Sequence, residues 1–236
     1  MPLPADLRRM NSFGQIMLDS FPRAMAVPDP LALFFDWLGE RAVVRRKDQL
    51  FAFVDPSWKR SSLFIEPVTS GDGASWADSP DPQVTDRLAP FCATGGDGSR
   101  AALWSDDSGR TRIVHMGSGS GSTMAGILVE DAVDFLRLLA IGYDELCWPE
   151  DHDQTPREVY VRQRAELQKV GGKQGLELFG DFDEPHELRN WVSTTFGVTV
   201  PATAADLVGK LGEIGDEGSD DPFLQWLAQL DRPARR

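Results

Sequence analysis

Apolar residues recur at helical spacing in several stretches of the chain. Between residues 31 and 38, leucine and phenylalanine return every three or four positions, after an Asp-Pro start signal and before Gly39. A longer apolar stripe follows Asp131 and comprises Ala132, Phe135, Leu136, Leu139, Tyr143 and Leu146. Both patterns predict amphipathic helices, and aspartates at the start of the second suit the positive end of a helix.

Shorter apolar runs predict strands. Residues 42–54 and 61–68 contain runs rich in β-branched and aromatic residues. Two further runs, at 101–104 and 113–116, flank the turn-type sequence at 106–109, Asp-Asp-Ser-Gly. These last two runs predict a β-hairpin.

Polar segments and a second set of helices complete the pattern. Residues 69–86 are rich in Gly, Ser, Asp and Pro and are expected to form an exposed loop, whereas the proline-containing, acidic residues 149–157 predict a linker. Beyond the linker we expect four helices, at residues 158–170, 184–196, 203–214 and 221–230, the first ending at Gly171-Gly172.

The order of these elements predicts an α+β fold, a mostly antiparallel sheet flanked by helices and followed by a C-terminal helical extension. We place the α+β domain at residues 1–148, the acidic linker at 149–157 and the extension, packed on the domain, at 158–236.

Charge is divided unevenly along the chain. The formal net charge is −13, but residues 1–60 carry a net +2 and residues 61–236 a net −15. Such a potential repels phosphate backbones and attracts a basic partner. We therefore expect a protein partner with a basic surface and no direct contact with nucleic acid, although solubility alone also explains the acidity.

The location of the protein is predicted from what its sequence lacks. The first residues have no apolar core of signal-peptide length, and no stretch approaches the roughly 18 apolar residues of a membrane span. Cys92 and Cys147 form no CxxC pair or disulfide framework, so a reducing compartment is expected. The sequence thus predicts a cytoplasmic protein that does not contact membranes.

The candidate chemistry is sparse. The chain has three histidines, and the spacing of His152 from Cys147 matches no structural zinc pattern. The glycine-rich residues 95–99 lack the lysine of a phosphate-binding loop and precede a strand instead of a helix. We predict no catalytic, metal or cofactor site, and hence a protein that is not an enzyme.

Two of the seven tryptophans lie beside or within polar loops. Trp58 and Trp76 are candidate partner contacts, because exposed tryptophan is enriched at binding hot spots. Packing in the core or in a local cluster is the alternative for each.

Residues 90–146 resemble the SUKH superfamily, which includes the fungal Smi/Knr cell-wall regulators and many bacterial immunity proteins. The matching residues, in family order, are Pro90-Phe91, Thr94-Gly95-Gly96-Asp97-Gly98-Ser99, Ala102-Leu103-Trp104, Val114-His115-Met116-Gly117-Ser118 and Asp134 to Tyr143. The helical tail lies outside the family domain, and residues 1–60 carry no clear counterpart of its N-terminal element.

The resemblance implies a binding protein. Bacterial members are similar to cognate inhibitors of secreted polymorphic toxins, often nucleases or deaminases, and Asp97, Asp106 and Asp107 are candidate contacts because they lie at turns near the motif. The alternative is a non-catalytic regulatory or scaffold module similar to the fungal proteins.

Overall fold

The computed structural model describes residues 12–47, 49–58, 61–79, 81–216 and 218–230. Its centre is one eight-stranded sheet in which neighbours along the chain are neighbours in the sheet, and every pair is antiparallel. The strands are β1 (Val43–Arg46), β2 (Gln49–Phe53), β3 (Phe64–Ile65), β4 (Leu88–Ala93), β5 (Arg100–Ser105), β6 (Thr111–Met116), β7 (Met124–Val129) and β8 (Gly212–Glu213).

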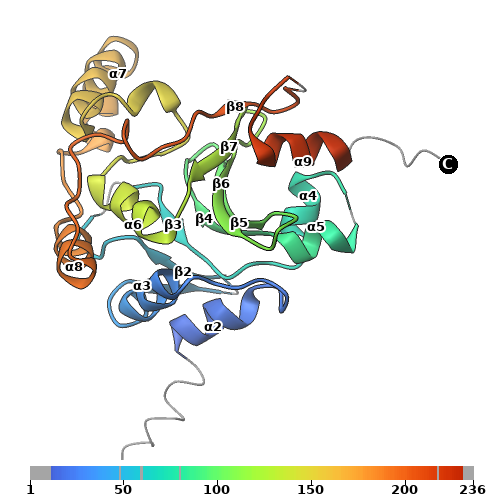
Figure 1. Ribbon diagram of the computed structural model, residues 1–236. Coiled ribbons are helices and arrows are strands. Elements are labelled where there is room, and N and C mark those ends of the chain that lie inside the picture. Colours follow the sequence, from blue (N-terminus) through green and yellow to red (C-terminus); the bar gives the residue numbers. More distant parts are fainter. Residues whose placement is uncertain (1–11, 48, 59–60, 80, 217, 231–236) are drawn as a thin grey trace, which may run out of the picture.

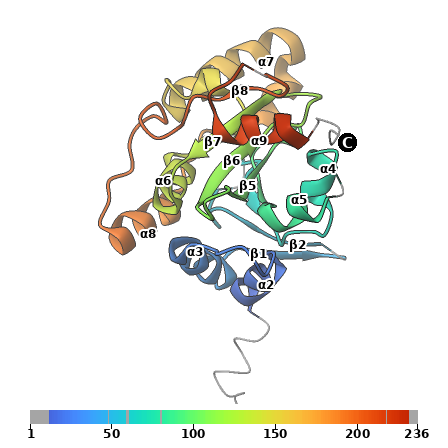
Figure 2. The ribbon, with the colours of Figure 1, turned by 45° about the vertical axis from the view of Figure 1, so that its right-hand side comes forward.

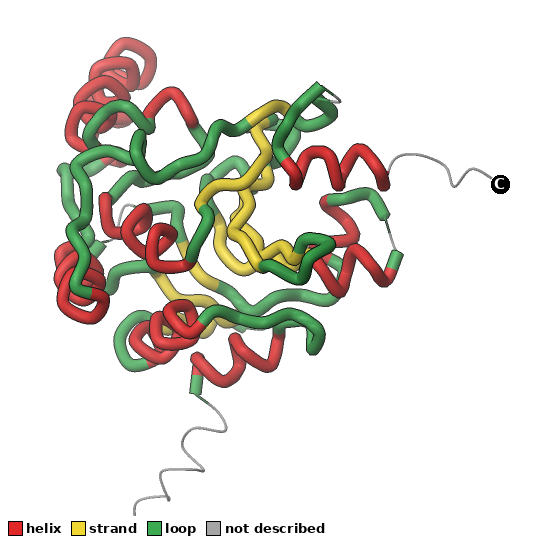
Figure 3. Tube along the Cα trace, viewed as in Figure 1, coloured by secondary structure: helices red, strands yellow, loops and turns green. Residues whose placement is uncertain are grey.

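Helices lie on both sides of this sheet (Figures 1 and 3). They are α2 (Phe13–Ser20), α3 (Asp29–Gly39), α4 (Asp72–Trp76), α5 (Pro82–Arg87), α6 (Ala132–Ile141), the 3-10 turn η1 (Pro149–Asp151), α7 (Pro156–Phe179), α8 (His186–Phe196) and α9 (Pro222–Leu230). In Figure 1, α3, α6 and α8 lie to the left of β4–β7, and α4, α5 and α9 lie to the right. The turned view keeps α9 beside α4 and α5 (Figure 2).

Two helical layers are needed because the central strands are apolar on both faces. Along β5, Ala101 and Leu103 enter the larger core cluster, whereas Ala102 and Trp104 enter a second, smaller one. Successive strand side chains point to opposite faces, so this alternation places the two clusters on opposite sides of the sheet. The larger cluster includes α3 and α6, and the smaller one includes α9.

Aromatic contacts join α9 to the second face of the sheet. Phe223 is fully buried and contacts Trp104, Trp76 and Trp226, with ring centroids 5.4, 5.8 and 5.9 Å away. Aromatic pairs at such distances add to the stabilisation from buried area. The C-terminal tail therefore completes the core on this side.

Two aspartates fix the tail to the rest of the chain. Asp221 accepts hydrogen bonds from the first turn of α9 and, through its other oxygen, from the Ile127 amide of β7 at 2.8 Å. Asp55, which is buried, accepts from the Leu188 amide of α8 at 2.8 Å. Each carboxylate satisfies amides that a helix start or sheet edge leaves without a backbone partner.

The predicted α+β class and antiparallel sheet are confirmed. The helices predicted at 31–38, 184–196 and 221–230 correspond to α3, α8 and α9. The hairpin is β5 and β6, and the helix after Asp131 is α6, whose N-cap is that aspartate. The predicted stripe extends too far, because α6 ends at Ile141 where Gly142 turns into the left-handed region. Tyr143 and Leu146 therefore lie beyond the helix, although both are buried in the larger core cluster.

Two local predictions are wrong because tertiary contacts override local composition. Residues 69–86 form α4 and α5 instead of a loop, and Gly73 lets α4 approach β4 so closely that an added Cβ would lie 2.5 Å from a backbone oxygen. Residues 203–214 are not a helix. The amides of Gly209 and Ile214 donate instead to Leu128 and Thr123, so the segment follows the sheet edge and forms β8.

The linker predicted at residues 149–157 and the helix end predicted at Gly171-Gly172 are also wrong. Within residues 149–157, Asp151 and His152 are buried, and Asp151 pairs with Arg162 of α7. The helix predicted to end at Gly171-Gly172 continues to Phe179, because glycine inside a helix costs only about 1 kcal/mol relative to alanine. Among the described helices, none is both long and apolar enough to cross a membrane.

The contacts of Phe223 lead to a prediction about the free energy of unfolding. Phe223→Ala should lower the free energy of unfolding by about 3–5 kcal/mol, because it leaves a cavity between α9 and the sheet. Urea denaturation measures this change. The control Val170→Ala alters a side chain that is 89% exposed and should change the value by less than about 0.5 kcal/mol. A loss below about 1 kcal/mol for Phe223→Ala would show that α9 does not complete the core.

Candidate functional site

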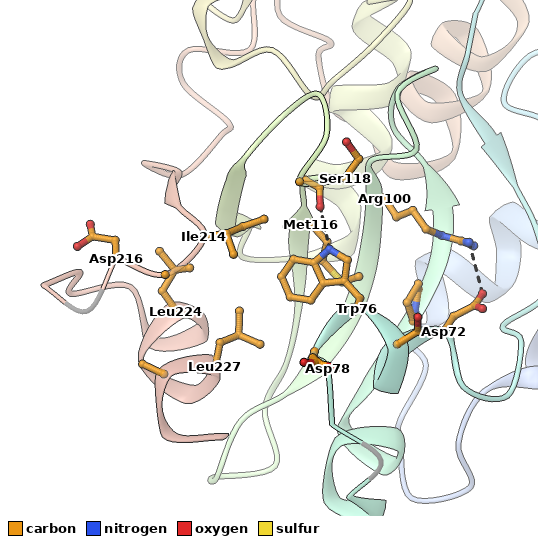
Figure 4. Close-up of a pocket in the computed structure, with 17 residues that line it drawn as sticks. Asp72, Trp76, Asp78, Arg100, Met116, Ser118, Ile214, Asp216, Leu224 and Leu227 are labelled. Atoms are coloured by element: carbon orange, nitrogen blue, oxygen red, sulfur yellow. Dashed lines mark hydrogen bonds and ion pairs between the residues drawn. The ribbon is translucent and has the colours of Figure 1, made fainter. Parts of the chain in front are cut away.

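A pocket of about 780 Å³ opens between α4, the end of β6 and the β8–α9 segment (Figure 4). Elements from the middle and the C-terminal tail of the chain therefore build it together. Its lining consists of Asp72, Ser75, Trp76, Ala77, Asp78, Pro90, Arg100, Met116, Gly117, Ser118, Gly119, Ile214, Gly215, Asp216, Leu224, Leu227 and Ala228.

Trp76 lies in the middle of the pocket in a fixed orientation. Its indole Nε1 donates to the Gly117 carbonyl at 2.8 Å, and one ring face stacks on Phe223 with an interplanar angle of 19°. Figure 4 shows Ile214, Leu224 and Leu227 on one side of the indole and Arg100 with Asp72 on the other. The centre of the pocket is thus apolar.

The charged groups lie around this apolar centre. Arg100 forms ion pairs with Glu66 and, at 3.4 Å, with Asp72. The carboxylates of Asp78 and Asp216 are exposed, and neither is in an ion pair with another described residue. Because the one arginine in the lining is already paired, the pocket carries a negative charge.

Asp97 ties together the two turns beside the pocket. Its carboxylate accepts from the Ser99 amide and hydroxyl, from the Ser118 hydroxyl at 2.9 Å and from the Ser122 amide at 2.8 Å. Burial alone would raise the pKa of Asp97, but these hydrogen bonds outweigh it and lower the pKa to about 2. The glycine-rich turn therefore has a structural use, the positioning of this carboxylate.

A second, more open cavity of about 470 Å³ lies on the β2–β3 side of Arg100. Phe51, Phe53 and Phe64 line it together with the glycine-rich turn, and the ring centroid of Phe51 lies 5.5 Å from that of Phe53 and 5.4 Å from that of Phe64. The three rings are half-buried. In the described lining, the charged residues are Arg100 and Glu66, which form an ion pair with each other.

The two tryptophans proposed as contacts differ. Trp58 is 1% exposed and belongs to the larger core cluster, so its role as a surface contact is wrong and packing explains it. Trp76 is half-buried and lines the pocket. Flanking polar sequence could not separate the two, because burial depends on which helix covers each loop.

The three aspartates proposed as contacts do not form one surface. Asp97 lies before β5, whereas Asp106 and Asp107 follow its far end. Asp106 caps its own turn, where the Ser108 hydroxyl, among other donors, lowers its pKa to about 2, and it pairs with Arg112. Asp107 is 85% exposed and pairs with Arg87 at 2.8 Å.

The sequence did not identify the residues that give the pocket its negative charge. Asp78 belongs to a segment expected to be a loop, and Asp216 begins an acidic run that gives no signal of its own. The one sequence feature that pointed toward the pocket was the apolar pattern of α9. This helix covers Trp104 and also supplies Leu224 and Leu227 to the pocket lining.

His115 is fully buried in β6 on the face opposite the pocket. Neither ring nitrogen has a hydrogen-bond partner among the described residues, and burial, with a smaller effect of His152, lowers its pKa to about 4. The described residues contain no group of three or more His, Cys, Asp or Glu side chains arranged to hold a metal ion.

No family model, curated protein or solved structure matches this chain.

The burial of His115 predicts a loss of stability in acid. Its folded pKa of about 4 lies below the ordinary value of 6.5, so the unfolded chain takes up a proton that the folded protein excludes. Stability should fall as the pH drops below 6.5, by a total of roughly 3 kcal/mol from this residue once the pH is below 4.

Urea unfolding of His115→Leu at pH 7 and pH 4.5 checks this expectation. The variant should lose part of the pH dependence and keep its stability at pH 7, because leucine leaves no unpaired polar atoms. His186→Leu, at an exposed position of α8, is the matched control and should behave like the parent protein. An unchanged pH dependence in His115→Leu would contradict the prediction.

Proposed function

We propose that this chain is a SUKH-type binding protein that neutralises a secreted bacterial toxin with a basic surface, without catalysing a reaction. The observation that carries the proposal is the acidic pocket around Trp76, in a chain whose residues 61–236 carry a net charge of −15. Apolar surface surrounded by charge is typical of sites where proteins bind one another.

The arrangement of the residues that resemble the SUKH superfamily supports the proposal. Residues 90–146 run without interruption through β4, β5, β6, β7 and α6. Asp97, the acidic residue of the glycine-rich turn, accepts a hydrogen bond from the hydroxyl of Ser118, the last residue of the matching stretch 114–118. The separate sequence motifs are therefore parts of one structural unit.

The charge of the chain suits a toxin directed against nucleic acid. Such a toxin needs a basic surface to bind its own substrate, and an acidic inhibitor competes for that surface. In this proposal the protein acts in the cytoplasm, contacts no membrane or nucleic acid, and needs no cofactor. Opposite charges also speed the encounter of the two proteins.

A co-expression assay tests the proposal. A toxin encoded by a gene adjacent to that of this chain should arrest growth alone and fail to do so when this protein is also produced. The purified pair should form a complex. Absence of both protection and complex would refute the proposal, and capture of several partners without any toxin would favour the scaffold alternative.

Association with the toxin should depend strongly on salt. Because long-range attraction drives the encounter, the association rate should fall at least tenfold between about 0.05 and 0.5 M NaCl, while the dissociation rate changes less. Stopped-flow fluorescence measures both rates. An association rate independent of salt would show that the acidic surface does not guide the encounter.

A further inference from the structure

We infer that the pocket around Trp76 receives a cationic side chain, arginine or lysine, carried by an apolar segment of the partner protein. The inference rests on the proposed function and deepens it, because it states which surface of this protein binds and what chemistry the partner must present. It is carried by three features of the pocket, which are its apolar walls, its uncompensated charge and its fixed indole ring.

The walls favour an apolar segment. Leu224 and Leu227 of α9 face Trp76, and Ile214 beside them is 43% exposed, which is high for a large aliphatic side chain. A partner segment that covers these side chains removes their apolar surface from water, which is the main source of binding free energy at protein interfaces.

The charge favours a cation over an anion. A free positive group would favour an anionic ligand, but Arg100 already has Glu66 and Asp72 as partners. Asp78 and Asp216, in contrast, have no ion pair with a described residue, and Figure 4 shows them on different sides of the apolar centre. Because both carboxylates line the pocket, they make its potential negative, which attracts a cation and repels an anion.

The indole provides the third feature. Tryptophan is the aromatic side chain that attracts cations best, and here its orientation is fixed before binding by the Gly117 hydrogen bond and by the stacking of Phe223. A fixed ring loses little conformational entropy when a ligand arrives. Trp76 is half-buried and lines the pocket, with Phe223 stacked on its ring.

Two capped peptides test the inference. One has the sequence Gly-Leu-Arg-Leu-Gly, and the other carries citrulline, the neutral isostere, in place of arginine. Titration is followed by the indole N–H signal of Trp76 in two-dimensional NMR, assigned with a Trp76→Phe variant. The arginine peptide should shift this signal and bind at least about fivefold more tightly than the citrulline peptide.

Charge-removing variants locate the cation. Asp78→Asn and Asp216→Asn together should weaken the arginine peptide by at least about fivefold and leave the citrulline peptide unchanged. Both positions are exposed, and Asp78 has a positive φ of 47°, which asparagine tolerates, so the fold should be preserved. Asp181→Asn removes the same charge from an exposed position in the connection between α7 and α8 and should have no effect.

Equal binding of the two peptides, or an unchanged Trp76 signal at saturation, would overturn the inference. The toxin assay separates it from the proposed function. If the double variant still protects cells and binds the toxin as tightly as the parent protein, the toxin binds elsewhere and only the inference fails. If the arginine peptide binds as expected and no toxin is neutralised, only the proposed function fails.

Discussion

A sheet that is apolar on both faces has to be covered on both faces, and the rest of this structure depends on that constraint. Trp104 and Leu103 are neighbours in β5 and point into opposite cores. The helices α3 and α6 cover one core. The other has the short helices α4 and α5, and it is closed by α9, which arrives from the far end of the chain. The tail is therefore part of the packed structure.

The same constraint produces the candidate site. Once α9 packs against Trp104 through Phe223, its Leu224 and Leu227 lie opposite Trp76 of α4. The pocket forms where the helical layer on this face does not close completely. Because α4 and the β8–α9 segment also bring carboxylates, this opening becomes an acidic site with an apolar centre.

Three aspartate carboxylates, one buried and two half-buried, position the parts around that core. Asp97 joins the two turns at one end of β5 and β6, Asp221 joins α9 to β7, and Asp55 joins α8 to the loop after β2. Each carboxylate accepts a hydrogen bond from a backbone amide in a segment distant in sequence, and loss of the carboxylate would leave that amide without this acceptor. Acidic residues in this chain thus serve both as structural acceptors and as uncompensated surface charge.

The sequence by itself determined the elements with strong local signals. These are α3, α6, α8, α9 and the β5–β6 hairpin, whose apolar spacing, caps and turn residues lie close together in the chain. It also determined the acidity, which depends on composition alone. Only the tertiary structure decided that β8 pairs with β7, that α4 forms in a polar segment, and that Trp58 is buried while Trp76 lines a pocket. These features depend on contacts between residues far apart along the chain, which local periodicity does not record.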